Sequence, residues 1–193
     1  MGGGVTAIEF ENGARTASHC QGCPYSAHGP AVGPRGDPVS RIVIVGEAPG
    51  EQEVMQRRPF VGPAGEVLFG ALHEAGLNEG ELFITNAIAC KPYPRPRPHI
   101  RAIEACANRL VDLLSAHPRA VVVTLGATAF RATTGRRGFR MKDVRGTVVD
   151  SPWGPLLPSL HPARVLRVRS ERPLFVMDLE RARALSRTNT ADR

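Results

Sequence analysis

The sequence predicts an α/β fold with a mainly parallel sheet that helices cover on both faces. Three observations predict it. The chain has 193 residues, 42% of them hydrophobic, which is enough for one well-buried core. Short β-branched runs alternate with segments of helical periodicity. Two of those runs stop at a glycine, as strands that lead into loops do. Because ligands of such folds bind beyond the carboxyl ends of the strands, the functional residues are expected there.

The individual elements follow from periodicity and from turn residues. Buried strands are expected over 41–45, 82–88 and 120–125, with further strands around 148–149 and 156–160. Helices are expected over 64–75, 100–114, 127–134 and 174–185. We expect a single domain over 16–185, with disordered segments at 1–15 and 186–193.

The charge pattern points to a polyanionic partner without proving one. The net charge is +7, and Lys91 and Lys142 are the only lysines among 25 basic residues. Arginine richness of this kind fits nucleic-acid binding, and it fits a GC-rich genome equally well. No run approaches the roughly 20 apolar residues of a membrane span, and the first residues lack the features of a signal peptide. A cytosolic protein without membrane contact is therefore expected.

The chain has four cysteines, Cys20, Cys23, Cys90 and Cys106. In a reducing compartment disulfides are rare, so a set that includes a C-x-x-C is interpreted first as metal ligands or redox groups. Small buried hydrophobic residues are the ordinary alternative. The spacing does not fit a zinc ribbon, which favours two short knuckles, and by itself it leaves an iron–sulfur cluster and zinc equally open.

Further candidates follow the predicted strands. Glu47 stands in a Gly-rich loop after the first strand, where backbone amides can bind an anion and a carboxylate can orient water. Phe60 precedes a helix, and an aromatic ring near such a loop can stack on a base. Asn86 offers a donor and an acceptor that suit a pyrimidine edge, and His161 follows a later strand. A turn glutamate, a core phenylalanine, a turn asparagine and a structural histidine are the ordinary alternatives.

Taken together, these motifs resemble the uracil-DNA glycosylase superfamily, in its iron–sulfur branch called family four. The matching motifs run in order from Cys20 to Arg167: C-x-x-C at 20–23, G-E-A-P-G at 46–50 with a nearby acidic residue, P-F-V-G-P-A-G at 59–65, N-x-x-x-C at 86–90, a further cysteine, H-P-A at 161–163 and Leu-Arg at 166–167. Several motifs in one order are far more specific than any one of them.

The resemblance implies a three-layer α/β/α sandwich and hydrolysis of the N-glycosidic bond of a uracil flipped out of DNA, leaving an abasic site. It implies that the four cysteines hold a structural 4Fe-4S cluster. It assigns stacking on the base to Phe60, reading of its polar edge to Asn86, and stabilisation of the developing charge to His161. Glu47 then handles the water and the sugar. The other residues that the resemblance brings to the substrate are Gly46, Ala48 and Glu53, the last as a barrier to the thymine methyl group.

Contacts to single- or double-stranded DNA are implied for residues outside the pocket. The resemblance makes Leu166 a wedge in the gap left by the flipped nucleotide, and a monomer is expected. Phosphate contacts are implied for four arginines, namely Arg95, Arg97, Arg164 and Arg167.

Two departures from the family pattern keep alternatives open. The 91–98 loop lacks the usual Asn-Arg pair, and Arg57 stands where relatives tend to have glycine. A related branch traps uracil covalently through a histidine of an inserted segment in this loop, whereas here Arg95 stands near that position and His99 lies at a helix start. The alternatives are a weakly active member, or one that acts on other deaminated bases, and a non-catalytic metal-bearing module that binds nucleic acid.

Overall fold

The computed structural model describes residues 22–25, 29–94 and 97–188. Within these residues six strands form one sheet in the order β1-β3-β2-β4-β6-β5. The four central strands pair in parallel, and the two outer strands are antiparallel. The strands are β1 (Arg35–Gly36), β2 (Ile42–Gly46), β3 (Leu82–Asn86), β4 (Val121–Leu125), β5 (Val149–Ser151) and β6 (Gly154–Ser159). The predicted mainly parallel sheet is confirmed.

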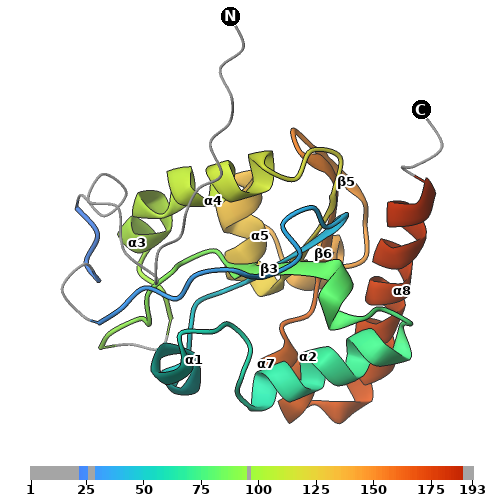
Figure 1. Ribbon diagram of the computed structural model, residues 1–193, viewed down its shortest axis with the longest axis horizontal. Coiled ribbons are helices and arrows are strands. Elements are labelled where there is room, and N and C mark those ends of the chain that lie inside the picture. The colour runs from blue at the N-terminus through green and yellow to red at the C-terminus, as the bar shows by residue number, and fades with distance from the viewer. Residues whose placement is uncertain (1–21, 26–28, 95–96, 189–193) are drawn as a thin grey trace, which may run out of the picture.

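Helices cover both faces of this sheet, which gives three layers (Figure 1). On one face lie α2 (Pro63–Glu74), α7 (Pro162–Arg167) and α8 (Arg172–Thr188). On the other lie α3 (Ile100–Ala105), α4 (Ala107–Ser115) and α5 (Gly126–Thr134). Shorter elements are α1 (Glu51–Gln56), η1 (Glu79–Glu81), α6 (Met141–Val144) and η2 (Arg169–Glu171).

Alternation along β2 divides the core into two. Ile42 and Ile44 pack in a cluster with residues of α2 and α8, whereas Val43 and Val45 pack in a second cluster with residues of α4 and α5. Successive side chains of a strand point to opposite faces of its sheet, so the four β-branched residues before Gly46 contribute to both clusters. This arrangement fixes the register that brings the carboxyl ends of β2, β3 and β6 to one edge.

The structure differs from the sequence prediction at several boundaries. The helix expected over 100–114 is two helices, since Cys106 ends α3 and caps α4. Helix α7, which follows His161, and helix α1 were not among the helices expected. Helix α8 extends through Thr188, where the hydroxyls of Ser186 and Thr188 donate to the carbonyls of Arg183 and Leu185, so 186–188 are not an irregular tail. The segments 1–15 and 189–193 lie outside the described residues.

No helix in the described ranges combines the length and the apolar character that crossing a bilayer requires.

Candidate active site

A pocket of about 390 Å³ opens beyond the carboxyl ends of β2, β3 and β6. Five residues that the sequence assigned to the substrate or to catalysis line it, namely Ala48, Glu53, Phe60, Asn86 and His161. The wall also contains residues to which no site role was assigned: Gly50, Glu51, Gln52, Gly62, Pro63 and Ala64. Four of them lie within the quoted family motifs, whereas Glu51 and Gln52 belong to helix α1, which was not expected.

Gly46, the last residue of β2, allows Asn86 and Phe60 to meet behind the pocket. Gly46 pairs with Asn86 in the parallel register. A methyl group at Gly46 would lie 2.2 Å from Asn86 Oδ1 and 2.5 Å from Cζ of Phe60. Such distances are well inside van der Waals contact, so the absence of a side chain is required here. Asn86 is 5% exposed, and its carboxamide is therefore a buried polar group at the pocket wall.

Phe60 has a backbone conformation that its residue type rarely adopts. Its φ is +56°, in the left-handed region, where a non-glycine residue carries strain of about 1–3 kcal/mol. The neighbouring chain holds it there: a side chain at Gly65 would lie 2.0 Å from the Phe60 carbonyl oxygen, and Arg35 of β1 donates to the Pro59 carbonyl at 3.0 Å. Strain of this kind concentrates at functional sites, which fits a ring fixed against a ligand.

Glu53 and Glu51 sit on α1 at the pocket rim. The backbone N–H of Gly50 donates to Oε2 of Glu53 at 3.1 Å, so this carboxylate also closes the first turn of α1. Glu51 forms an ion pair with Lys91, which directly follows Cys90. The pocket rim is thus tied to the loop that carries the third cysteine.

His161 is held as a neutral imidazole with a defined tautomer. It caps α7, and its Nδ1 accepts a hydrogen bond from the Ala163 N–H at 3.2 Å. Burial lowers the pKa of His161; Glu47 and Glu53 oppose that shift, and Arg167 adds to it. With Nδ1 used as an acceptor, the ring proton is on Nε2. Nε2–H is therefore the donor that this residue can offer to a ligand in the pocket.

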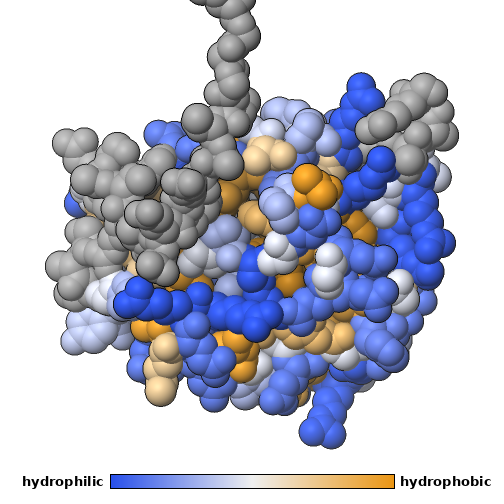
Figure 2. Space-filling model, viewed as in Figure 1, coloured by the Kyte–Doolittle hydropathy of each residue, from blue (hydrophilic) through white to orange (hydrophobic). Residues whose placement is uncertain are grey.

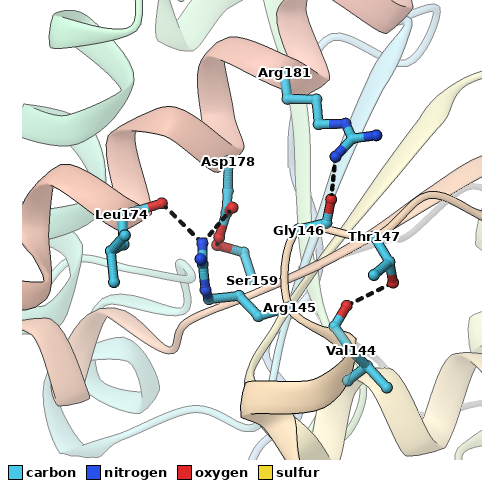
Figure 3. A network of polar contacts seen from close by, with 8 residues as sticks. All are labelled: Val144, Arg145, Gly146, Thr147, Ser159, Leu174, Asp178 and Arg181. Carbon is cyan, nitrogen blue, oxygen red and sulfur yellow. Dashed lines mark hydrogen bonds and ion pairs between the residues drawn. The ribbon is translucent and has the colours of Figure 1, made fainter.

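A buried ion pair anchors the end of β6, two residues before His161 (Figure 3). The Ser159 hydroxyl donates to Oδ2 of Asp178 at 2.6 Å, and Arg145 donates to Oδ1 at 2.7 Å. Burial raises the pKa of Asp178, and its bonds to Ser159 and Arg145 oppose that rise. The carboxylate of Asp178 on α8 therefore binds both β6 and the loop at Arg145, close in the chain to His161.

The residues expected to contact DNA lie at the surface. Leu166 on α7 is 43% exposed, and Arg97 and Arg167 are exposed as well. The guanidinium of Arg164 donates through Nε and Nη2 to Glu171, so it already has an acidic partner. Arg95 lies outside the described residues. Figure 2 shows strongly hydrophilic residues along the outer side of α8, on the margin of the molecule.

Three of the four cysteines gather in the core on the α4 side of the sheet. Cys23, Cys90 and Cys106 belong to one hydrophobic cluster, and all three are buried and outside any disulfide. The N–H of Tyr25 donates to the Cys23 sulfur at 3.5 Å, and the Tyr25 hydroxyl accepts from the His99 N–H at 2.7 Å. Cys20 lies outside the described residues, and among those described no three cysteine, histidine or acidic side chains form a group able to hold a metal ion.

His99, a point of comparison with the covalent-trapping branch, serves the fold instead. It caps α3, and its Nδ1 accepts from the Arg101 N–H at 3.2 Å. It is absent from the residues that line the pocket. Its position therefore argues against covalent capture by this residue.

Fold and pocket together place a neutral imidazole, a buried carboxamide and an aromatic residue around one space at the carboxyl edge of an α/β sheet, an arrangement typical of an enzyme site. A family model described as the uracil DNA glycosylase superfamily matches residues 34–183, and the chain belongs to that superfamily. The family expected from the motifs is therefore confirmed.

Individual relatives agree with this membership. The chain is 34% identical over 170 residues to a type-4 uracil-DNA glycosylase of Thermotoga maritima, an alignment that covers 86% of this chain and 88% of the relative. A type-4 uracil-DNA glycosylase of Pyrobaculum aerophilum is 34% identical over 169 residues, 83% of this chain and 86% of the relative. A type-5 uracil-DNA glycosylase of Thermus thermophilus is 36% identical over 135 residues, with coverage of 62% and 60%.

Proposed function

We propose that the protein is a uracil-DNA glycosylase that hydrolyses the N-glycosidic bond of a flipped uracil and leaves an abasic site. The observation that carries the proposal is the pair formed by His161 and Asn86 in one pocket wall. A neutral Nε2–H donor and a buried carboxamide match the polar edge of a pyrimidine. Because the imidazole is neutral, an uncharged base can bind beside it without facing a charge.

The chemistry follows from where charge develops as the bond breaks. The bond stretches toward a uracil anion and a sugar with oxocarbenium character, so catalysis consists of electrostatic stabilisation and positioning. Nε2–H of His161 donates to the uracil carbonyl oxygen that gains negative charge. Asn86 holds the edge of the base, and Phe60 stacks on its face. The carboxylate of Glu47 orients the water and stabilises the positive sugar.

Glu53 and the surface residues complete the proposed site. Glu53, fixed by the Gly50 N–H, stands as the barrier to the methyl group of thymine. Leu166 enters the gap in the duplex, and Arg95, Arg97, Arg164 and Arg167 contact phosphates, with Arg164 exchanging Glu171 for a phosphate oxygen. We place this activity on chromosomal DNA in a prokaryotic cytoplasm.

The test is excision from an oligonucleotide that carries one uracil. The purified protein is expected to produce an alkali-labile abasic product without added metal. Asn86→Ala and His161→Gln are expected to lower the excision rate strongly, to a residual rate that single-turnover kinetics can still measure, while the fold is kept. Arg137→Gln, which breaks only an exposed ion pair with Glu104, is expected to excise normally. A cluster-replete wild-type preparation that leaves the uracil strand intact would sink the proposal. Excision of hypoxanthine but not of uracil would show that the substrates are other deaminated bases.

We propose that the four cysteines hold a 4Fe-4S cluster. What supports the iron–sulfur cluster is the type of donor: Cys23, Cys90 and Cys106 are buried thiols in one hydrophobic core cluster, none forms a disulfide, and thiolates are the ligands of iron–sulfur clusters. In the described part of the chain their side chains do not meet as a metal-binding group. When bound, the cluster supplies a structural crosslink between the N-terminal segment, the 91–98 loop and α4.

Iron and acid-labile sulfide in equal amounts are the expected contents of the purified protein, together with visible absorption. Cys106→Ser should lose both the absorption and stability, whereas His161→Gln should keep both. Zinc without sulfide in the purified protein would contradict the cluster and leave the proposed activity standing.

A further inference from the structure

Arg109 on α4 belongs to none of the motifs described above, yet its side chain reaches the carboxyl end of β3. Its Nη2 donates to the carbonyl oxygen of Asn86 and, at 3.3 Å, to that of Ala87. Its Nη1 donates to the hydroxyl of Thr85 at 3.4 Å. One partly buried guanidinium thus binds three consecutive residues whose centre is the pocket asparagine.

The Asn86 peptide is held from β2 as well as from α4. The N–H of Ala87 donates to the Gly46 carbonyl at 2.9 Å, and the N–H of Ile88 donates to the Glu47 carbonyl at 3.1 Å. These bonds use the backbone N–H groups of Ala87 and Ile88, whereas Arg109 binds the backbone carbonyls of Asn86 and Ala87. Because a side chain projects from its own backbone, fixing these peptide groups also fixes the direction of the Asn86 carboxamide.

A guanidinium suits this task better than an ammonium group. Its N–H donors lie in one plane in a rigid fork, so a single side chain can serve two neighbouring carbonyls. Lysine offers a compact charge that reaches one carbonyl well. Arg109 also lies one turn after Cys106, which caps α4, so one helix carries both a thiol and this contact.

We propose that Arg109 is a positioning residue for uracil excision, acting through the orientation of Asn86. The inference rests on the proposed function, because it assigns Arg109 to the same pocket. It predicts that Arg109 contributes to the rate only while the Asn86 carboxamide is present. A residue that only served as a hydrogen-bond donor to two carbonyls would contribute to stability. Its effect on the rate would not depend on the Asn86 carboxamide.

The experiment is a double-mutant cycle on single-turnover excision. Arg109→Gln is expected to lower the rate by about tenfold or more, since small misplacements of catalytic groups have effects of this size. In an Asn86→Ala background the same change is expected to lower the residual rate by less than about twofold, because residues that act as a unit are strongly non-additive. Free uracil should inhibit Arg109→Gln more weakly than wild type, and Arg109→Lys should fall between the two. Arg137→Gln is the matched control.

Equal rate losses in both backgrounds, or a wild-type rate and wild-type uracil inhibition in Arg109→Gln, would overturn the inference. Thermal unfolding of each variant separates loss of fold from loss of position. If Arg109→Gln does not fold, Arg109→Lys carries the same cycle, and its additivity decides. A wild-type protein without excision activity would overturn the proposed function itself. An additive cycle in an active enzyme would overturn only the role of Arg109.

Discussion

Gly46 lies so close to Asn86 and Phe60 that any side chain at this position would clash with both. Gly46→Ala is expected to lower the excision rate by about a hundredfold, because the methyl group displaces Asn86 and the Phe60 ring, and displacements of about 1 Å have effects of this order. Overpacking should also reduce the free energy of unfolding by about 1–3 kcal/mol. Single-turnover kinetics and urea unfolding measure the two effects.

Gly80 provides the matched control for this substitution. A methyl group there meets no atom within 4 Å, so Gly80→Ala should leave the excision rate unchanged. Wild-type excision by Gly46→Ala would show that the wall can relax, contrary to the geometry at the end of β2.

The lowered pKa of His161 couples the stability of the fold to pH. The unfolded value is near 6.5 and the native value is lower, so the native state binds fewer protons. This contribution to stability is fully present above about pH 6.5 and is lost as the pH falls through the native pKa. The unfolding free energy of wild type, relative to His161→Gln, should therefore decrease between about pH 8 and about pH 5. Urea unfolding at the two pH values measures it, and identical pH dependence in both proteins would contradict the buried neutral histidine.

The order of motifs along the sequence predicted the residues of the pocket better than it predicted the residues that hold them in place. Asn86 and His161 were predicted because family motifs contain both, the carboxamide near the end of one predicted strand and the imidazole just after another. Arg109 was not, since an arginine at an amphipathic helix position gives no signal of the strand end it reaches. The strained φ of Phe60 is equally silent in sequence, because the conformation comes from the close approach of Gly65.

At the scale of elements, the carboxylate of Asp178 links three parts of the fold: α8, β6 and the loop before β5. Asp178→Ala removes the acceptor of the fully buried Ser159 hydroxyl and the carboxylate partner of the partly buried Arg145, which keeps the Leu174 carbonyl. Breaking a buried pair in this way should reduce the free energy of unfolding by about 3–5 kcal/mol, measured by urea unfolding.

Asp143→Ala is the control for that loss. It removes the acceptor of Arg140 in an exposed pair, and such pairs contribute about 1 kcal/mol or less. A loss of similar size in both variants would show that burial of the Asp178 pair adds nothing.

The elements that the sequence predicted well are those whose signal is local. Strands β2 and β4 consist of β-branched and aliphatic residues that end at a glycine, and α2 has a clear apolar stripe that stops before Gly76. Helix α1 was missed because it has only six residues and no buried side chain. Helix α7 was missed because a histidine, an unusual capping residue, stands at its start. The break at Cys106 was missed because apolar periodicity continues across it.

At the scale of the whole molecule, the alternation of strands and helices was sufficient to predict the layers and the edge that carries the pocket. It did not predict β1, which has only two residues and pairs antiparallel with the distant strand β3. A strand was expected around 148–149, and β5 covers Val149–Ser151 and pairs antiparallel with the adjacent strand β6.

These two outer strands have a consequence for self-association. A sheet can be extended by another molecule only where its lateral strands offer a row of unpaired backbone groups, and short, reversed edge strands offer few. We therefore expect the protein to sediment as a single species whose size does not change with concentration. Concentration-dependent growth in sedimentation velocity would show that the sheet edges are open to other copies. If the sheet edges stay closed in this way, many copies are expected to bind along one DNA molecule without associating with each other.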